Sequence, residues 1–315
     1  MTAPARLHLG FLDLNGGLGR RYGSIGLAIE EPATELVVRR AAAPATSGPE
    51  AGRAARSIAR FADAFGLSGS YGVSVARAIP AHAGLGSGTQ LSLAIGTALA
   101  RLEGLDRTPR AIGEMETRGA RSAIGMAAFE CGGFIVDGGR GQTDRAPPVL
   151  MRADFPPEWR ILLVLDRASQ GVHGDRELQA FAALPPFPEG RAAHLCRLVL
   201  MRLIPALIER DIDAFGAAIS EIQAIVGAHF ACAQGGSPWS SPAVGRLVSR
   251  LAAAGAVGIG QSSWGPTGFA FTRTETEAQN LYCSFVQEAK AQGLELLLVR
   301  GRNTGARIDL AAAGP

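Results

Sequence analysis

The sequence predicts an α+β protein with two domains, and three observations carry this prediction. The 315 residues suffice for about two domains of ordinary size. Hydrophobic residues make up 47% and charged residues 19%, which allows a sizeable core and excludes disorder as the overall state. Strand-like and helix-like segments are interleaved without the regular rhythm of a doubly wound parallel sheet, and this favours α+β.

The first half of the chain shows several strand patterns and two helical patterns. Residues 5–14 alternate apolar and polar side chains, as a half-buried strand does. The Ala/Pro/Ser-rich stretch 41–50 is expected to be an exposed loop. An apolar helix is expected after the glycine-rich turn 84–88. The segments expected in this half are strands at 5–14, 22–30, 33–40, 71–79 and 134–137, and helices at 54–66 and 91–102.

Prolines 147, 148, 156 and 157 punctuate the middle of the chain, and there we place the domain boundary. The expected domains are residues 1–155 and 156–315. Residues 191–227 have helical spacing and are expected to form two helices around Pro205, followed by a loop at 229–243. The other segments expected are strands at 160–166, 256–259, 267–272 and 294–301, and helices at 243–254 and 274–292.

The composition excludes several classes of protein. No apolar run reaches the ~18 residues that a membrane span needs, the longest being Leu91–Leu102. Charged residues near the start interrupt any apolar signal segment. We therefore expect a cytoplasmic protein with no membrane partner. The four cysteines contain no C-x-x-C pair, which argues against a disulfide scaffold and a cysteine zinc site. They are Cys131, Cys196, Cys232 and Cys283.

The basic residues are almost all arginine, because Lys290 is the only lysine among 31 basic residues. The net charge is only +3, the arginines are dispersed and aromatic residues make up 6%, so no nucleic-acid partner is expected. The arginine bias is interpreted first as the base composition of a GC-rich genome. The second interpretation is that some arginines hold a carboxylate or phosphate.

The strongest local signal is a glycine-rich turn between a predicted strand and a predicted helix. Its members are Gly84, Leu85, Gly86, Ser87, Gly88, Thr89 and Gln90. Glycines let a ligand approach the backbone, and the free N–H groups at a helix start attract negative charge. A Walker A loop is excluded because its lysine is absent, and the G-x-G-x-G spacing does not match the dinucleotide fingerprint. We predict a phosphate site, with a plain glycine turn as the alternative.

Two other segments are rich in polar groups. Gly258–Gly268 combines glycines, hydroxyls, an amide and a tryptophan in one turn between strands, a composition that often lines sites. The first strand carries Arg6 and His8 at a spacing of two, which places them on one face, and Asp13 near its end. An ordinary loop and a structural histidine are the plainer interpretations.

Together the three segments resemble the motifs of the GHMP kinase superfamily, which includes galactokinase, homoserine kinase and mevalonate kinase. Ala3–Asp13 resembles the first motif, Pro80–Gln90 the P-x-x-x-G-L-G-S-S phosphate loop, and Gly258–Phe271 the C-terminal glycine-rich motif. The resemblance covers nearly the whole chain. It implies an N-terminal domain like ribosomal protein S5 domain 2 and a C-terminal ferredoxin-like α/β plait.

Departures from the kinase pattern affect the phosphoryl-transfer apparatus. Where mevalonate-kinase-like enzymes have the catalytic aspartate of an S-G-I-D-N segment, this chain has Gly125. The second serine of the phosphate loop, which often helps to hold magnesium, is replaced by Gly88. A glycine cannot orient a hydroxyl or take its proton, so the fold is expected to carry other chemistry or none.

One non-kinase branch, the β-ribofuranosylaminobenzene 5′-phosphate synthase family, resembles the chain more closely. The matching strings are Arg6–Gly10, Gly23–Leu27, Gly84–Gln90, Gly132–Gly139, Gln234–Gly236 and Gly260–Pro266. The resemblance implies a pentosyltransferase of tetrahydromethanopterin biosynthesis. It would convert phosphoribosyl pyrophosphate and 4-aminobenzoate or 4-hydroxybenzoate to a C-riboside, CO2 and pyrophosphate. A homodimer is also implied.

This reaction suggests roles for particular residues. The turn 84–90 would hold pyrophosphate, and Trp264 would help to exclude water from the ribose cation. An arginine would hold the benzoate carboxylate, and another group would accept a hydrogen bond from the para substituent. The arginine candidates are Arg6, Arg121 and Arg176, and the acceptor candidates are His8, Asp13 and His173. Further substrate-binding candidates are Ser24, Ser122, Gln234, Gln261, Ser262 and Ser263.

Mg2+ is the one cofactor expected, because pyrophosphate leaves, and its protein ligands stay open. Asp175 and Glu177 are metal candidates, with a helix-start role as the simpler interpretation. Neither pyridoxal phosphate nor nicotinamide is expected, and ATP is not expected either. Two alternatives to the synthase remain: a GHMP small-molecule kinase that uses ATP, and a non-catalytic ligand-binding relative.

Overall fold

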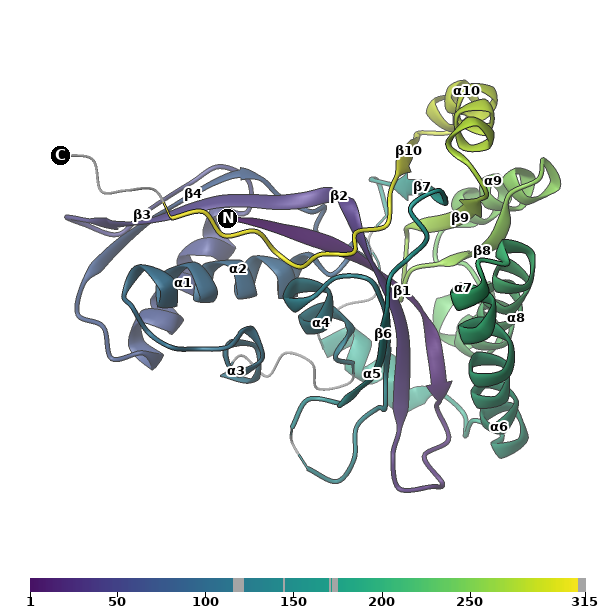
Figure 1. Ribbon diagram of the computed structural model, residues 1–315, viewed down its shortest axis with the longest axis horizontal. Coiled ribbons are helices and arrows are strands. Elements are labelled where there is room, and N and C mark those ends of the chain that lie inside the picture. Colours follow the sequence, from purple (N-terminus) through teal and green to yellow (C-terminus); the bar gives the residue numbers. More distant parts are fainter. Residues whose placement is uncertain (116–121, 144, 170, 172–174, 311–315) are drawn as a thin grey trace.

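The computed structural model describes residues 1–310 except 116–121, 144, 170 and 172–174. The chain forms two sheets, each with helices packed against it (Figure 1). One sheet has six strands in the order β3-β4-β2-β5-β6, with β1 paired to β2. The other has four strands in the order β10-β7-β9-β8. The predicted α+β class is confirmed.

The six-stranded sheet is built around a long hairpin of β1 and β2. Its strands are β1 (Thr2–Asp13), β2 (Tyr22–Ala41), β3 (Ala45–Ser47), β4 (Ser70–Arg77), β5 (Phe134–Asp137) and β6 (Val149–Ala153). The prediction of two strands at 22–30 and 33–40 was wrong, because β2 is continuous. Ile29 pairs with Ala5 and Ala33 with Pro4, so Pro32 falls in a bulge where the ladder needs no N–H.

The described residues of the first half form four helices, and two of them were not predicted from the sequence. They are α1 (Ala51–Ala64), α2 (Ser87–Leu102), α3 (Pro109–Met115) and α4 (Ile124–Glu130). Figure 1 shows them gathered on one side of the sheet. Most of α2 is buried, as expected from its apolar sequence, because α1, α4 and β2 surround it. A short strand, β3, lies inside the stretch 41–50 that was predicted to be loop only.

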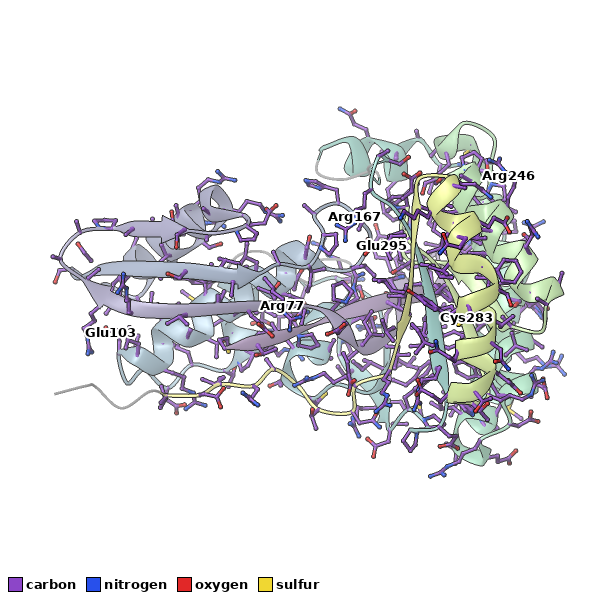
Figure 2. The ribbon with its side chains drawn as sticks, turned by 90° about the horizontal axis from the view of Figure 1, so that it is seen from above. Arg77, Glu103, Arg167, Arg246, Cys283 and Glu295 are labelled. Carbon is purple, nitrogen blue, oxygen red and sulfur yellow. The ribbon has the colours of Figure 1, made fainter. Side chains whose placement is uncertain are left out.

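The four-stranded sheet lies between two helical layers. Its strands are β7 (Arg160–Asp166), β8 (Val257–Gln261), β9 (Gly268–Thr272) and β10 (Leu294–Val299). The helices of this half are α5 (Asp175–Ala183), α6 (Glu189–Leu198), α7 (Ile204–Glu209), α8 (Ile212–Phe230), α9 (Pro242–Ala253) and α10 (Glu275–Ala291). Figure 2 shows α10 along the outer side, with Arg167 and Glu295 close together. These two residues form an ion pair of 2.5 Å that ties β7 to β10.

The break between the helices of residues 191–227 is not at Pro205. A π-helical turn, Val199–Leu203, joins α6 to α7 without interruption, and Pro205 stands in the first turn of α7. Because the helices are continuous here, Pro205 removes one N–H from the helical ladder, directly after the turn in which the hydrogen bonding is π-helical. The helix ends at Arg210, whose φ is 60°. Asp211 then caps α8 by accepting from the Ala214 N–H at 3.0 Å.

The longest apolar helix is α8 rather than the segment 91–102. Residues 212–234 are long and apolar enough to cross a membrane by length and composition alone. In the structure, however, Phe215, Ile219 and Ile222 are fully buried against neighbouring elements of the same chain. The apolar character of α8 is therefore that of a core helix.

The hydrophobic core joins the two halves of the molecule. The largest cluster brings Leu7 and Leu9 of β1 together with Phe215 of α8 and Phe269 of β9. A tail after β10 returns to the first sheet, as the yellow trace in Figure 1 shows. There Arg302 N–H donates to Ala28 O at 2.8 Å, and Arg307 exchanges two backbone hydrogen bonds of 2.8 Å with Thr2.

Candidate active site

The three predicted motif segments meet around Ser262. Its side chain is fully buried, and its Oγ accepts from the His8 N–H at 3.0 Å and donates to Gly84 O at 2.8 Å. The Ser263 N–H donates to His8 O at 3.2 Å. One hydroxyl thus connects β1, the glycine-rich turn and the loop after β8, three segments far apart in the sequence.

Gly84 is the point of closest approach between the turn and this loop. Its φ is +76°, and a Cβ built there would lie 2.3 Å from Ser262 O and 3.0 Å from Gly265 O. Both neighbours are backbone atoms that cannot move aside. Only glycine satisfies this conformation and this spacing.

The start of α2 has the features of an anion site. Gly86, at φ 81°, precedes the helix and supplies no side-chain cap, and the first turn holds no acidic residue. The N–H groups and hydroxyls of Ser87 and Thr89 have no hydrogen-bond partner among the described residues. An uncapped helix start of this kind attracts phosphate oxygens.

Arg6 adds positive charge beside the glycine-rich turn. Its Nη1 donates to Gly84 O at 2.5 Å, and its backbone N–H donates to Leu85 O at 3.1 Å. A Cβ on Gly86 would lie 3.2–3.4 Å from the Arg6 side chain, so the guanidinium rests against the turn. The structure therefore brings the predicted Arg6 and the turn 84–90 together.

Gly125 lies next to the same turn. A Cβ there would lie 3.1 Å from Thr89 Cγ2, which is tighter than most real contacts. Gln90 is fully buried and donates to Gly125 O at 2.7 Å, so its side chain joins α2 to α4, while its Oε1 has no hydrogen-bond partner among the described residues. The residue that the resemblance matches to the kinase aspartate therefore lies beside the turn, and it has no side chain.

A small cavity lies next to these contacts, and Ser263 and His8 are among the residues that line it. Its volume is about 20 Å³. It is lined by His8, Gly10, Phe11, Gln223, Val226, Gly227, Phe230, Gln234, Pro238, Gln261 and Ser263. Two residues of β1, His8 and Gly10, pair with successive residues of β2, Gly26 and Ile25. The resulting bulge at Leu9 brings the rings of His8 and Phe11 within 4.6 Å.

A chain of three glutamines forms one wall of the cavity. Gln223 donates to Leu9 O at 2.7 Å and accepts from the Gln261 N–H at 2.8 Å. The Gln261 side chain accepts from the Ser240 N–H at 2.7 Å and donates to Gln234 Oε1 at 3.0 Å. Gln223 was missed from the sequence, because a glutamine in an apolar helix gives no signal of its partners.

Trp264 belongs to an aromatic cluster beside the cavity. Its ring stacks on Phe230 at 4.5 Å and meets Phe181 edge-on at 5.2 Å. The side chain is 3% exposed, and its Nε1 has no partner among the described residues. This position is compatible with the expected role of excluding water, and it also makes Trp264 a core residue.

A second polar cluster surrounds a buried carboxylate on β5, Asp137. It accepts from the N–H groups of Ser24 and Ala123 at 3.1 and 2.9 Å, and from Ser122 Oγ at 3.1 Å. Burial raises the pKa of Asp137, while these hydrogen bonds oppose the rise. The predicted Ser24 and Ser122 are therefore gathered here, where Asp137 fixes the start of α4. Asp137 itself lies in a matched string but was not predicted as a site residue.

Other predicted residues lie apart from the cavity or outside the described set. Asp13 Oδ1 accepts from the N–H groups of Asn15 and Gly16 at 2.7 and 2.9 Å, so it closes the turn after β1 and does not line the cavity. Arg121 and His173 lie outside the described residues. Asp175, Arg176 and Glu177 stand in α5, and their side chains are likewise outside the description.

No group of three or more His, Cys, Asp or Glu side chains that could hold a metal occurs among the described residues. Mg2+ commonly keeps several waters and binds through substrate phosphates. The hydroxyls of Ser87 and Thr89, at the uncapped start of α2, suit that arrangement, because they are oxygen ligands with no other partner in the described structure.

Asp166 supports the loop that orients Gln261, and its titration gives a testable prediction. Although burial opposes it, hydrogen bonds from Ser169 and Ser241 Oγ, each 2.7 Å, lower the pKa of Asp166. Its contribution to stability is therefore present above the ordinary aspartate pKa of about 3.9 and lost as the pH falls through the lower folded value. We expect Asp166→Asn to lower the free energy of unfolding by about 1–3 kcal/mol at pH 7.

Urea unfolding of both proteins from pH 7 downward tests this expectation. The gap between wild type and Asp166→Asn should narrow as the pH falls below the ordinary aspartate pKa. A gap that does not change with pH would mean that the carboxylate charge does not stabilise this loop.

Comparisons with known proteins identify the class of fold. Models of the GHMP kinase N-terminal and C-terminal domains match residues 51–133 and 203–291. A homoserine kinase structure from Cytophaga hutchinsonii is 17% identical with a TM-score of 0.67, covering 96% of this chain and 94% of that one. Phosphomevalonate kinase from Streptococcus pneumoniae is 14% identical with a TM-score of 0.69, covering 96% and 98%. The predicted GHMP-kinase-like fold is confirmed.

Curated relatives then identify the family within this class. β-Ribofuranosylphenol 5′-phosphate synthase from Methanothermobacter thermautotrophicus is 34% identical, over 97% of this chain and 97% of the relative. The synthase from Archaeoglobus fulgidus is 33% identical over 98% and 99%. The chain belongs to the β-ribofuranosylphenol 5′-phosphate synthase family. It is accordingly an enzyme of the pentosyltransferase class.

Proposed function

We propose that the enzyme transfers the phosphoribosyl group of phosphoribosyl pyrophosphate to 4-hydroxybenzoate or 4-aminobenzoate, with release of CO2 and pyrophosphate. One observation carries the proposal: Arg6 lies beside the uncapped start of α2, which favours anion binding, and the neighbouring Gly125, which the resemblance matches to the kinase aspartate, has no side chain. The site can hold pyrophosphate, but it lacks the group that would activate a hydroxyl for phosphoryl transfer.

The proposed reaction consists of two bond exchanges without a redox step. The ring carbon that bears the carboxylate attacks the anomeric carbon, and the electron pair of the broken C–O bond leaves with pyrophosphate. The bond to the carboxylate then breaks, CO2 departs, and its electron pair restores the aromatic ring. Mg2+, when bound, would neutralise charge on the pyrophosphate.

Several residues of this chain have parts in the proposed reaction. The N–H groups of Ser87 and Thr89 and the guanidinium of Arg6 would bind the leaving pyrophosphate. His8 is the only titratable side chain among the described residues that line the cavity, so it would accept the hydrogen bond from the para group as positive charge develops there. Asp13 is not assigned this role, because its Oδ1 is committed to the turn after β1.

We also propose the pathway, the compartment, the oligomeric state and the cofactors of the enzyme. The product would enter tetrahydromethanopterin biosynthesis, and the enzyme would act in the cytoplasm as a homodimer without pyridoxal phosphate, nicotinamide or ATP. An apolar surface is available for a second copy. Leu200, Met201 and Ile208 are 64–69% exposed along the outer side of the helical run from α6 to α7.

Release of labelled CO2 tests the proposed reaction. The purified protein is incubated with Mg2+, phosphoribosyl pyrophosphate and carboxyl-labelled 4-hydroxybenzoate, with 4-aminobenzoate in parallel. We expect CO2 release that requires phosphoribosyl pyrophosphate and does not require ATP. Without release from either benzoate the proposal is wrong, and ATP turnover in the control would then favour the kinase alternative.

A further inference from the structure

A second and larger cavity, here called the edge cavity, lies at one edge of the four-stranded sheet. β8 is the last strand in the order β10-β7-β9-β8, and α8 and α9 pack on opposite faces of this sheet. The edge cavity is lined by residues of α8, α9, β8 and the loop before α9. Its volume of about 400 Å³ falls within the roughly 300–1,000 Å³ that is typical of small-molecule sites.

Side chains of α8 already bind the outward N–H groups of β8 at this edge. The Ile259 N–H donates to Ser220 Oγ at 3.1 Å, and the Gln261 N–H donates to Gln223 Oε1 at 2.8 Å. A Cβ on Gly260 would lie 2.4 Å from Gln223 Cδ, so the glutamine side chain lies directly over the strand. A peptide that added as a further strand would need these N–H groups, so the edge cavity does not suit a peptide strand.

The walls of the edge cavity leave room for a flat ring. Ser220, Ala224 and Ala228 follow one another at a spacing of four along α8, so these small side chains share one face of the helix. The half-buried indole of Trp239 rests against α9, where a Cβ on Gly245 would lie 2.6 Å from its Cγ. The space beside the indole is therefore bordered on the α8 side by small side chains only.

The edge cavity offers hydrogen-bond donors and no charge. Its lining contains no Asp, Glu, Lys, Arg or His among the residues that the structure describes. In the same part of the chain, Trp239 Nε1 has no hydrogen-bond partner, and the hydroxyl proton of Ser220 has no acceptor although its oxygen accepts from Ile259. A charged ligand would lose its hydration without gaining a counter-charge, whereas acceptor atoms on a neutral ring would use both donors.

We propose that the edge cavity is a second ligand site, separate from the candidate active site, which binds an uncharged planar heteroaromatic molecule with acceptor atoms on its ring. The acceptor atoms would receive the protons of Ser220 Oγ and Trp239 Nε1. Gln223 and Gln261 line both this cavity and the smaller one beside His8, so the ligand would lie next to a wall of the candidate active site. The inference does not depend on the proposed function.

Caffeine is a suitable probe, because it is an uncharged bicyclic ring whose polar atoms are all acceptors. We expect the whole protein to bind caffeine saturably in a ligand-observed NMR titration, with a Kd of about 1 mM for a ligand of this size. Ala224→Phe, at an exposed position on α8, would fill the edge cavity and should weaken binding by about 10-fold or more. Ala228→Phe, one turn further along the same wall, should act in the same way if the first variant does not fold.

Two further variants make the test specific. Ala217→Phe is the matched control, because Ala217 is also exposed on α8 but does not line the edge cavity, and it should leave the Kd unchanged. Trp239→Phe keeps an aromatic ring and removes the N–H, so the Kd should rise by about 3- to 10-fold, the effect of one hydrogen bond of ordinary strength.

Three results would overturn the inference. They are the absence of saturable binding to wild type, a Kd for the filled variant equal to that of wild type, and a Kd that does not change in Trp239→Phe. None of them bears on the release of CO2, so the second site and the proposed function are tested separately.

Discussion

Replacement of Gly84 by alanine is expected to abolish CO2 release and to destabilise the fold. At φ +76° an alanine costs about 1–2 kcal/mol. The new Cβ would also lie 2.3 Å from Ser262 O, so the turn and the loop after β8 would have to separate. We expect an activity loss of about 100-fold or more, because a small displacement of a positioned site has effects of this size.

Gly104→Ala is the matched control for this substitution. Gly104 also has a positive φ, +68°, but nothing lies within 4 Å of a Cβ built there. The control should therefore show the conformational cost alone, in thermal unfolding, with CO2 release preserved. Similar activity of the two variants would show that the contact between Gly84 and Ser262 is not needed for the reaction.

Arg6→Met is expected to weaken binding of phosphoribosyl pyrophosphate while the protein stays folded. The guanidinium rests on the turn at the start of α2, and its loss removes the charge that faces the anion site. A hydrogen bond to a charged group contributes about 1.5–3 kcal/mol, which corresponds to a rise in KM of about 10- to 100-fold. Steady-state kinetics with saturating benzoate measure this change.

Arg101→Met controls for the change in net charge. Arg101 is exposed in the last turn of the same helix, at the end away from the turn. The two variants lose the same charge, so only a local effect separates them. If Arg101→Met raises the KM for phosphoribosyl pyrophosphate as much as Arg6→Met, the anion site is not where we place it.

Much of the architecture could be predicted from local patterns. The strands Phe134–Asp137 and Arg160–Asp166 have the predicted bounds, because each is a short apolar run between clear turn signals. The helix after the glycine-rich turn was predicted for the same reason. Two of the three motif segments were found because glycine and hydroxyl residues cluster in them, and the first because Arg6 and His8 share one face of a strand that ends near Asp13.

The missed features depend on tertiary contacts. The bulge at Leu9 puts His8 beside Phe11, although alternation along the strand places His8 with Arg6. The carboxylate of Asp137 is held by donors from β2 and the segment before α4, more than ten residues away. The cavity itself arises where β1, α8 and the loop after β8 converge, and no local pattern records that meeting.

The pairing of Thr2 with Arg307 joins the first strand to the last described stretch of the chain. A ribosome makes the partner of Thr2 only after both sheets have been synthesised. The hydrogen bonds of the N-terminal sheet are therefore complete only after the tail has been made. The large core shared by β1, α8 and β9 likewise forms only once both halves are present. The contacts of Ser262 with His8 and Gly84 can likewise form only after the loop that follows β8 has been made, so the site also assembles late in synthesis.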